Sequence, residues 1–297
     1  MTEATPNSGS RGYSPELRTR ALIEALPYIQ QFRGSVVVVK FGGNAMVDPD
    51  LSKTFAEDIV LLRSVGLKPV VVHGGGPQIG ELLSRLGMET EFRDGLRITD
   101  SATLDVARMV LVGKVGREIV GHINTHGAYA VGMSGEDGRL IEAVPRHPDL
   151  GFVGNVHAVN PGMVERLLAE DLIPVISSIG SDAQGQAYNI NADTVAGAVA
   201  GALGAEKVVY LTDVAGLLTD LDEPTSLVAK ATVAELEAWV ADGTINGGMV
   251  PKVGACIESV RAGARSAHLL DGRVPHVLLL ELFTDAGIGT MITAGTQ

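Results

Sequence analysis

The stretch Val36-Val37-Val38-Val39-Lys40-Phe41-Gly42-Gly43-Asn44-Ala45 decides the fold of this chain. Four valines in a row, with Gly34 before them and a glycine pair after Phe41, predict a short strand buried on both faces. Lys40 stands at the C-terminal end of this strand, where open parallel sheets bind their ligands. The glycines would let the backbone approach such a ligand. Taken alone, the pattern also fits a core strand whose final lysine simply reaches solvent, so the rest of the chain decides between the two interpretations.

Composition restricts the class of protein. The formal net charge of −12 over 297 residues argues against non-specific binding to nucleic acid or to an anionic membrane, although it permits a local basic pocket. A single cysteine, Cys256, excludes an internal disulfide framework and fits a reducing cytoplasm. The N-terminus has no signal-type apolar segment, and the late apolar run at 277–280 is too short to span a bilayer. We expect a cytoplasmic protein with no nucleic-acid and no membrane partner.

Strand and helix patterns alternate along the chain. Further buried strands are predicted at 69–72, 173–180 and 208–214, and helices between them at 50–65, 78–86, 101–125, 161–170, 194–203, 232–241 and 249–263. Shorter strands separated by polar turns and prolines predict hairpins at a sheet edge, at 129–133, 140–144 and 152–158. The alternation predicts an α/β fold, with an open, mainly parallel sheet and helices on both of its faces.

Three regions follow from this order of elements. Residues 1–32 hold a polar tail, predicted to be disordered up to Gly12, and then a helix over 14–32 that Pro27 should kink. The apolar stripe of this helix has no obvious partner within one lobe, so it packs either on its own sheet or on another subunit. A division near 180–190 separates an N-terminal lobe, 33–185, from a C-terminal lobe, 186–297, with a cleft between them.

Cations and glycine backbones follow several predicted strands. The second strand runs into Gly74-Gly75-Gly76-Pro77, where the proline suits the first turn of a helix and leaves the glycines at its positive end. Arg97 offers bidentate recognition of a carboxylate, or else it pairs with Asp94 or Asp100 at the surface. Lys252 stands at the start of a later helix. Together with Lys40, these groups suit phosphoryl transfer, in which catalysis is mostly positioning and charge stabilisation.

Several common catalytic signatures do not occur. No histidine pairs with a Ser or Cys nucleophile motif and no metal-ligand spacing is found, so His73, His268 and His276 are interpreted as hydrogen-bonding or structural groups. Ile79 stands where a dinucleotide-binding fingerprint needs glycine, which argues against a nicotinamide-dependent oxidoreductase.

Six motifs in register resemble the acetylglutamate kinases of the amino acid kinase superfamily: Lys40-Phe41-Gly42-Gly43, His73-Gly74-Gly75-Gly76-Pro77, Gly95-Leu96-Arg97-Ile98-Thr99, Asn189-Ile190-Asn191-Ala192-Asp193, Leu211-Thr212-Asp213-Val214 and Gly247-Gly248-Met249-Val250-Pro251-Lys252. The resemblance runs from about residue 17 to residue 290 and implies an α/β/α sandwich of two lobes. It implies phosphorylation of the γ-carboxylate of N-acetyl-L-glutamate by ATP with Mg²⁺, in arginine biosynthesis. The alternatives are a sister kinase for another acylated amino acid or a carrier-linked aminoadipate, and a non-catalytic arginine sensor.

The resemblance also implies a role for each matching residue. Lys40 and Lys252 would stabilise the transferring phosphoryl group, and Asp193 would hold both lysines. The N–H groups of Gly43 and Gly75 would bind the same phosphoryl group. N-Acetylglutamate would contact Gly75, Gly76, Arg97 and Asn189, and ATP would contact Lys40, Gly42, Gly43, Thr212, Asp213, Gly216, Leu217 and Lys252. A γ-carboxyl group with a pKa near ~4.3 is already ionised at neutral pH, so no general base is needed. The Mg²⁺ would be carried on the nucleotide, without a metal site on the protein.

Regulation and assembly are implied in the same way. Family members with an N-terminal helix are hexamers, built as trimers of dimers, and are inhibited by arginine. The residues that match the arginine site here are Lys207, His268, Glu281, Gly287 and Gly289. On this interpretation residues 1–32 serve oligomerisation, 33–185 bind the acylated amino acid and form the dimer, and 186–297 bind ATP and arginine. The alternative is that the helix caps its own sheet and that Glu281 is a solvated charge.

Overall fold

The main sheet confirms the predicted α/β class. The structure, a computed structural model, describes residues 14–93, 95–218, 223, 226–284 and 287–295; the tail predicted to be disordered lies outside them. Within the described residues this sheet has eight strands, in the spatial order β12 (Lys230–Thr232), β14 (Thr290–Thr293), β13 (Ser266–Asp271), β11 (Lys207–Thr212), β1 (Val36–Phe41), β2 (Lys68–His73), β8 (Ile173–Ser177) and β5 (Ala130–Ser134). All neighbours are parallel except β13 and β14.

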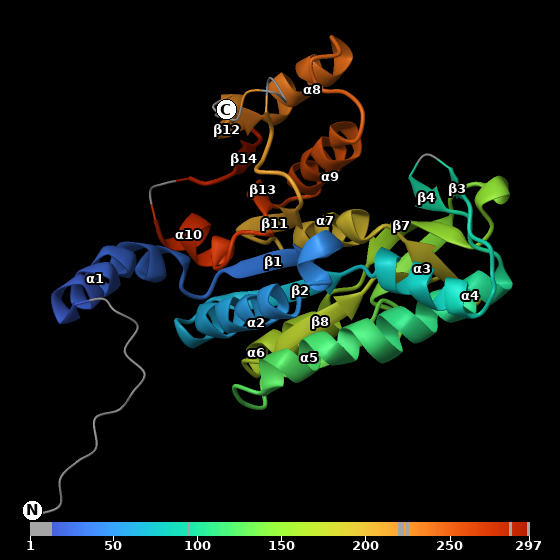
Figure 1. The fold of residues 1–297 in the computed structure, drawn as a ribbon, viewed down its shortest axis with the longest axis horizontal. Coiled ribbons are helices and arrows are strands. Elements are labelled where there is room, and N and C mark those ends of the chain that lie inside the picture. Colours follow the sequence, from blue (N-terminus) through green and yellow to red (C-terminus); the bar gives the residue numbers. More distant parts are fainter. Residues whose placement is uncertain (1–13, 94, 219–222, 224–225, 285–286, 296–297) are drawn as a thin grey trace, which may run out of the picture.

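Helices cover both faces of the sheet (Figure 1). Val37, Val39 and Phe41 of β1 belong to one apolar cluster, together with side chains of α2 (Pro49–Ser64), α5 (Gly116–Asn124) and α10 (Val277–Phe283). Val38 belongs to the other cluster, together with side chains of α6 (Gly162–Ala169), α7 (Ala192–Ala202) and α9 (Met249–Arg261). Because side chains alternate along a strand, Lys40 shares the face of Val38 and is directed toward the α7 side.

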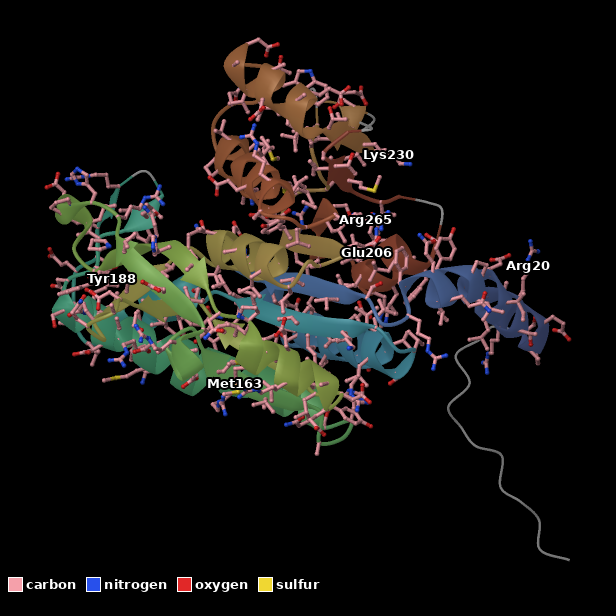
Figure 2. The ribbon with its side chains drawn as sticks, turned by 180° about the vertical axis from the view of Figure 1, so that it is seen from behind. Arg20, Met163, Tyr188, Glu206, Lys230 and Arg265 are labelled. Atoms are coloured by element: carbon pink, nitrogen blue, oxygen red, sulfur yellow. The ribbon has the colours of Figure 1, made fainter. Side chains whose placement is uncertain are left out.

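The predicted edge hairpins are wrong in two respects. β5 is an edge strand, but it pairs parallel with β8 and belongs to no hairpin. β6 (Ile141–Pro145) and β7 (Val153–Val159) do pair antiparallel, but they close a separate small barrel with β9 (Ile179–Ser181) and β10 (Ala187–Ile190). The predicted strand 173–180 is therefore divided at Ser178 between sheet and barrel. The barrel, marked by Tyr188, lies at the opposite end of the molecule from the N-terminal helix with Arg20 (Figure 2).

The N-terminal helix α1 (Pro15–Phe32) extends away from the sheet (Figure 1). Ser14 caps it by accepting a hydrogen bond from Leu17 N at 3.2 Å, and the helix continues through Pro27. Its last residue, Phe32, is buried in the core. Four large apolar side chains along it are exposed instead: Leu17, Leu22, Ile23 and Leu26.

The remaining helices complete the two layers and the loops. α3 (Gly76–Arg85) follows β2, and α4 (Ser101–Arg108), a π-helical segment η2 (Met109–Val115) and α5 form one continuous helical run. α8 (Val233–Ala241) precedes α9, and the short strands β3 (Phe92–Arg93) and β4 (Leu96–Arg97) form a ribbon of their own. Three 3-10 turns lie at η1 (Gly43–Met46), η3 (Asp137–Arg139) and η4 (Pro148–Leu150).

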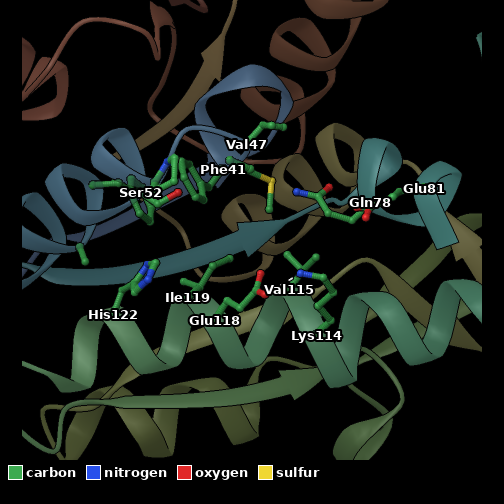
Figure 3. A pocket seen from close by; sticks show the side chains of 14 residues that line it. Phe41, Val47, Ser52, Gln78, Glu81, Lys114, Val115, Glu118, Ile119 and His122 are labelled. Atoms are coloured by element: carbon green, nitrogen blue, oxygen red, sulfur yellow. Dashed lines mark hydrogen bonds and ion pairs between the residues drawn. The ribbon is translucent and has the colours of Figure 1, made fainter.

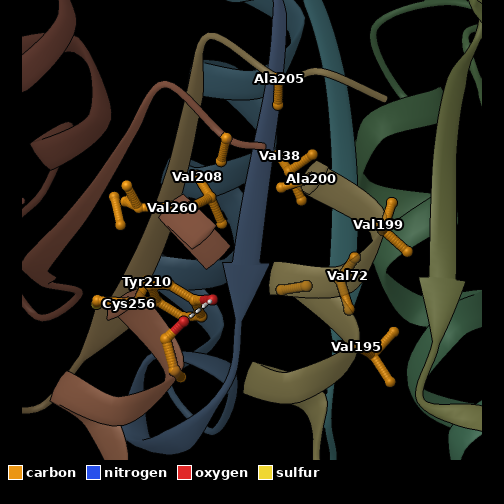
Figure 4. Close-up of a cluster of buried hydrophobic side chains, with 14 of the residues drawn as sticks. Val38, Val72, Val195, Val199, Ala200, Ala205, Val208, Tyr210, Cys256 and Val260 are labelled. Atoms are coloured by element: carbon orange, nitrogen blue, oxygen red, sulfur yellow. Dashed lines mark hydrogen bonds between the residues drawn. The ribbon is translucent and has the colours of Figure 1, made fainter. Parts of the chain in front are cut away.

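Helices α7 and α9 approach closely because their contact is made of small residues. A Cβ on Gly197 of α7 would overlap Ser259 Oγ of α9 and lie 3.0 Å from the hydroxyl of Tyr210. That hydroxyl and Ser259 Oγ are hydrogen-bonded at 2.6 Å inside the apolar cluster (Figure 4). The hydroxyl also donates to the carbonyl of Asp193 at 3.3 Å, which ties the start of α7 to β11.

Gly197→Ala should therefore destabilise the fold, by about 1–3 kcal/mol of overpacking. Gly254→Ala, in α9, is the matched control: a Cβ there meets no atom within 4 Å. Alanine has a higher helix propensity than glycine, so Gly254→Ala should stabilise the protein by about 0.5–1 kcal/mol. Urea denaturation of the two variants measures both changes. Equal changes in the free energy of unfolding would contradict the packing argument.

Candidate active site

A cavity of about 300 Å³ opens where β1 and β2 end. It brings together eight of the predicted site residues from distant parts of the sequence: Lys40, Gly42, Gly43, Gly75, Gly76, Arg97, Asn189 and Asp193. The predicted nucleotide residues Thr212, Asp213, Gly216, Leu217 and Lys252 do not line this cavity. The site therefore consists of two groups of residues.

The first group is organised by an ion pair between Lys40 and Asp193. Lys40 Nζ lies 3.0 Å from Asp193 Oδ1, and the two side chains are only 15% and 27% exposed. Asp193 stands in the first turn of α7, where Asn191 caps the helix by accepting from the N–H of Asp193 at 2.8 Å. Beyond this ion pair the buried Oδ1 has no hydrogen-bond partner among the described residues, so it can still accept from another donor. Gly42 leaves room for the lysine, because a Cβ there would lie 2.8 Å from Nζ.

The glycine loop after β2 forms the opposite wall. Gly75 is the N-cap of α3, and a Cβ on it would lie 2.7 Å from Leu111 and 3.2 Å from Val115, both in η2. Only glycine lets the backbone approach the helix this closely. His73, the residue before the loop, is fully buried, and its Nδ1 lies 2.9 Å from the carbonyl of Gly74. Burial, helped by the charge of the nearby Arg117 and opposed by the hydrogen bond with the Gly74 carbonyl, lowers the pKa of His73 to about 4, so the ring is neutral at pH 7.

Arg97 places a guanidinium at the cavity, and within the described residues it forms no ion pair with a carboxylate. Its guanidinium donates to Thr90 Oγ1 at 2.5 Å and to the carbonyl of Gly76 at 3.0 Å. It lies over the ring of Phe92, 4.6 Å from the centroid, and burial lowers its pKa. Asp100, one of the two predicted surface partners, caps α4 through Thr103 N instead, and Asp94 lies outside the described residues. Neutral oxygens orient the guanidinium and leave its charge available to an anion.

Thr99 is a site residue that the sequence patterns did not single out. It is fully buried, and its Oγ1 donates to the carbonyl of Arg97 at 2.8 Å and accepts from Asn189 Nδ2 at 3.4 Å. It therefore links the two side chains predicted to bind the acylated amino acid. The only sequence signal for it was its place at the end of the motif 95–99. Its backbone also pairs with Gly151, which brings the Pro-rich segment 145–150 next to this site.

The second group lies after the last residue of β11 and in the first turn of α9. Lys252 Nζ is 3.3 Å from Asp213 Oδ1, and this lysine holds the pKa of the Asp213 carboxyl below its usual range. Asp193 is thus paired with Lys40, whereas the carboxylate next to Lys252 is Asp213. Leu217 N donates to Thr290 Oγ1 at 2.8 Å, and a Cβ on Gly216 would lie 2.8 Å from the same oxygen. The loop after β11 is therefore fastened to the start of β14.

A second cavity, of about 370 Å³, lies between α2, α3 and the helical run η2–α5 (Figure 3). Phe41 and Phe55 stack in its wall with ring centroids 3.9 Å apart, and Lys114 pairs with Glu118 at 2.6 Å. It is larger than the cavity at Lys40, but none of the predicted site residues lines it.

The residues predicted to bind arginine form a buried polar cluster beside the end of α1. His268 Nδ1 lies 2.7 Å from Glu281 Oε1, and its Nε2 lies 3.2 Å from Lys207 Nζ. Although burial opposes ionisation of Glu281, the hydrogen bond with His268 and the charge of Lys207 hold the pKa of this carboxyl below its usual range. Lys207 Nζ also lies over the ring of Phe32, 5.1 Å from the centroid. Gly287 and Gly289 follow α10; the N–H between them, of Ile288, donates to Glu281 at 3.3 Å.

The described residues contain no group of three or more His, Cys, Asp or Glu side chains that could hold a metal ion. The donors at both parts of the site are ammonium, guanidinium and backbone N–H groups, which suit phosphate and carboxylate ligands. Among the helices of the described ranges, none has the length and apolar character to cross a membrane.

Comparison with known sequences decides the family. Residues 35–271 match the sequence model of the amino acid kinase family. This chain belongs to the amino acid kinase family. Acetylglutamate kinase of Nostoc punctiforme is 54% identical over 276 residues, 93% of each chain. Acetylglutamate kinase of Gloeobacter violaceus is 50% identical over 299 residues, 99% of each chain. The resemblance predicted from the six motifs is confirmed.

Solved structures support the fold of this kinase. N-Acetylglutamate synthase from Neisseria gonorrhoeae, complexed with coenzyme A and N-acetyl-glutamate, superposes with a TM-score of 0.81 at 24% identity. The match covers 94% of this kinase and 64% of that longer chain. Carbamate kinase from Giardia lamblia bound to AMP-PNP has a TM-score of 0.67 at 19% identity and covers 88% of this kinase and 99% of that chain. At these identities the likeness concerns the fold alone.

The buried, neutral His73 should give the kinase a measurable dependence of stability on pH. Its pKa is lower in the folded state than in the unfolded chain, so the unfolded chain binds more protons between pH 4 and pH 6.5. This part of the stability is present above pH 6.5 and is lost as the pH falls. From pH 7 to pH 5 the loss should be about 2 kcal/mol.

His73→Asn removes the titrating ring and serves as the reference. The free energy of unfolding in urea, measured for both proteins at each pH, should fall on acidification by about that amount more in wild type than in His73→Asn. A difference that stays constant over this range would contradict the neutral buried state of His73.

Proposed function

We propose that this amino acid kinase transfers the γ-phosphoryl group of ATP to the γ-carboxylate of N-acetyl-L-glutamate, giving N-acetyl-L-glutamyl 5-phosphate for arginine biosynthesis. The cavity that joins Lys40, the glycine loop and Arg97 carries the proposal. The names of relatives at 50% and 54% identity support the substrate. The single cysteine, which is free and buried, supports a reducing cytoplasm as the place of the reaction.

The chemistry fits the residues present. The attacking γ-carboxylate is ionised at neutral pH, so the barrier is the approach of one anion to another rather than proton removal. Lys40, the N–H groups of Gly43 and Gly75 and the N-terminus of α3 would offset that repulsion. Arg97 would bind the α-carboxylate, with Asn189 and Gly76 fixing the rest of the acylated amino acid. Asp193 does not add to the repulsion, because Lys40 compensates its charge.

ATP would lie at the second group of residues: Thr212, Asp213, Gly216, Leu217 and Lys252. Mg²⁺ would be carried by its phosphates and would neutralise part of their charge. Lys252 is held by Asp213 in this structure, and Asp193 Oδ1 retains acceptor capacity. Both observations support a step in which the bound phosphates draw Lys252 from Asp213 toward Asp193, so that Asp193 holds both lysines when the lobes close.

Two alternatives would share most of this site. A sister kinase for another acylated amino acid would use the same lysines, and the segment 145–150 beside Thr99 is where its pocket would differ. A non-catalytic arginine sensor would have no need of Lys40, Asp193 and Lys252 in their present arrangement. A substrate panel separates them: N-acetyl-L-glutamate, N-acetyl-L-aspartate and N-acetyl-L-2-aminoadipate, each tested for ATP-dependent ADP release.

Lys40→Ala and Lys252→Ala should each lower ADP release with N-acetyl-L-glutamate by about 10²–10³-fold, because each removes a donor to the transferring phosphoryl group. Lys53→Ala is the control, since Lys53 is 65% exposed and its partner among the described residues is Asp50, on the surface of α2. Thermal melting of the three variants checks that each is folded. Turnover near that of wild type in either site variant would refute the assignment, and ADP release without the acylated substrate would favour another acceptor.

We also propose that arginine inhibits the enzyme and that the enzyme is a hexamer, a trimer of dimers joined through α1. The cluster of Lys207, His268 and Glu281 supports the first point, since a carboxylate and a cation lie where an amino acid with a guanidinium could bind both. The exposed apolar side chains of α1 support the second. Phe32 joins the two features, because it ends α1 and lies against Lys207. Arginine would favour an open arrangement of the lobes that keeps Lys252 away from Lys40.

Leu22→Glu and Ile23→Glu together should break the hexamer into dimers, keep kinase turnover and weaken inhibition by arginine. The two side chains are 72% and 63% exposed, so the change leaves the core of the subunit intact. Gln31→Glu, on the polar face of α1, is the control for added charge. Light scattering gives the size of the assembly, and an arginine titration gives the inhibition. A double variant of unchanged size and sensitivity would contradict the proposal.

A further inference from the structure

His73 is a buried side chain that the proposed reaction leaves without a role. It ends β2 immediately before the glycine loop and has no exposed surface. Its Nδ1 lies 2.9 Å from the carbonyl oxygen of Gly74. A carbonyl only accepts hydrogen bonds, so the ring must carry its proton on Nδ1. The pKa of about 4 keeps this ring neutral, and Nε2 therefore holds a lone pair.

The hydrogen bond fixes the direction of the next N–H. No cis peptide bond occurs among the described residues, and in a planar trans peptide the C=O and the following N–H point in opposite directions. His73 holds the Gly74 carbonyl on the buried side of the loop. The N–H of Gly75 must then point to the other side, where Gly75 lines the cavity with Lys40 and Asp193.

Of the two ring nitrogens only Nδ1 has a hydrogen-bond partner in the described part of the chain. Nε2 is buried and has no hydrogen-bond partner in the described part of the chain, an arrangement that costs stability. A Cβ on Gly116 would lie 3.2 Å from Nε2, so the residue after η2 packs directly on the ring. Leu111 and Val115 of η2 press on Gly75 from the same side. The N–H of Gly116 bonds the carbonyl of Leu111 five residues earlier, the π-helical spacing, and π-helical turns of this kind are frequent at functional sites.

We propose that His73 is a positioning residue: its Nδ1–H holds the Gly74 carbonyl in the core and so directs the Gly75 N–H at the transferring phosphoryl group. This rests on the proposed function, which assigns the Gly75 N–H to that group. His73 does not line the cavity and its lone pair faces Gly116, so it takes no part in proton transfer. The π-helical segment supports the loop from behind, through Leu111 and Val115.

An isosteric pair of variants tests the donor. Asn places an N–H at the position of His Nδ1, whereas Leu has the same shape and no donor. His73→Asn should keep kcat within about fivefold of wild type, since the hydrogen bond is retained. His73→Leu should lower kcat by about 10²-fold, because the misdirected N–H no longer meets the reacting group. The Michaelis constant for ATP should change little in both. Leu suits an apolar core at least as well as Asn does. The melting temperature of His73→Leu should therefore not be lower than that of His73→Asn.

A second measurement does not depend on turnover. Hydrogen–deuterium exchange of the peptide covering residues 74–79 should be faster in His73→Leu than in wild type, and unchanged in His73→Asn. His73→Gln, whose amide lies at the ε position, should behave as Leu does and replaces it if the Leu variant does not fold. Between pH 6 and pH 9 wild type and His73→Asn should have the same pH profile of kcat.

The outcomes separate the two proposals. A wild-type enzyme that releases no ADP with N-acetyl-L-glutamate refutes the proposed substrate, and the exchange data then decide on the hydrogen bond alone. Equal kcat and equal exchange in the Asn and Leu variants would overturn the positioning role. Loss of activity in His73→Asn as large as in His73→Leu would do the same, since the imidazole itself would then be needed.

Discussion

The ion pair of Lys40 with Asp193 is the constraint on which the rest of the site depends. β1 lies in the middle of the sheet, and its alternating side chains fill both apolar clusters. A lysine on such a strand can be accommodated only at its end and only beside a compensating charge. Asp193 supplies that charge from the first turn of α7, where the helix N-terminus favours a carboxylate. The same contact that makes Lys40 tolerable in the core therefore aims it into the cavity.

Local positive potential is built into a chain whose net charge is −12. Arg97 is oriented by neutral oxygens, and backbone N–H groups of the glycine loop add donors without adding side chains. Lys252 lies beside Asp213, which is half exposed and can release it at small cost because exposed ion pairs contribute little to stability. The more buried pair is therefore the harder to separate, and this difference agrees with the proposal that bound nucleotide draws Lys252 from Asp213 and leaves Lys40 with Asp193.

Features of the structure that are set by one segment were predicted from the sequence, whereas features that depend on distant partners were missed. The buried strands, the cations at their ends and the glycine loop were predicted because each is set by a few adjacent residues. The barrel was missed because the pairing of β6 with β9, or of β7 with β10, leaves no local trace. The π-helical segment at 109–115 was missed because apolar residues occupy most of its positions, so the shift of face caused by one extra residue per turn does not show in the pattern. Thr99 was missed for a related reason: its value lies in linking Arg97 to Asn189, which are far apart in the sequence.

Helix α10 contacts α1, α2 and β13, which are far apart in the sequence. At its start His276 bonds Asp58 of α2 at 2.6 Å, and burial raises the pKa of Asp58 to about 6. One turn later Glu281 bonds His268 at the end of the polar cluster. The same helix packs on α1. A seven-residue helix is short enough to move as a rigid unit, so a ligand that shifted Glu281, as proposed above for arginine, would also act on α2 and on α1. The proposed regulation through Glu281 and the proposed assembly through α1 would therefore share one mechanical element.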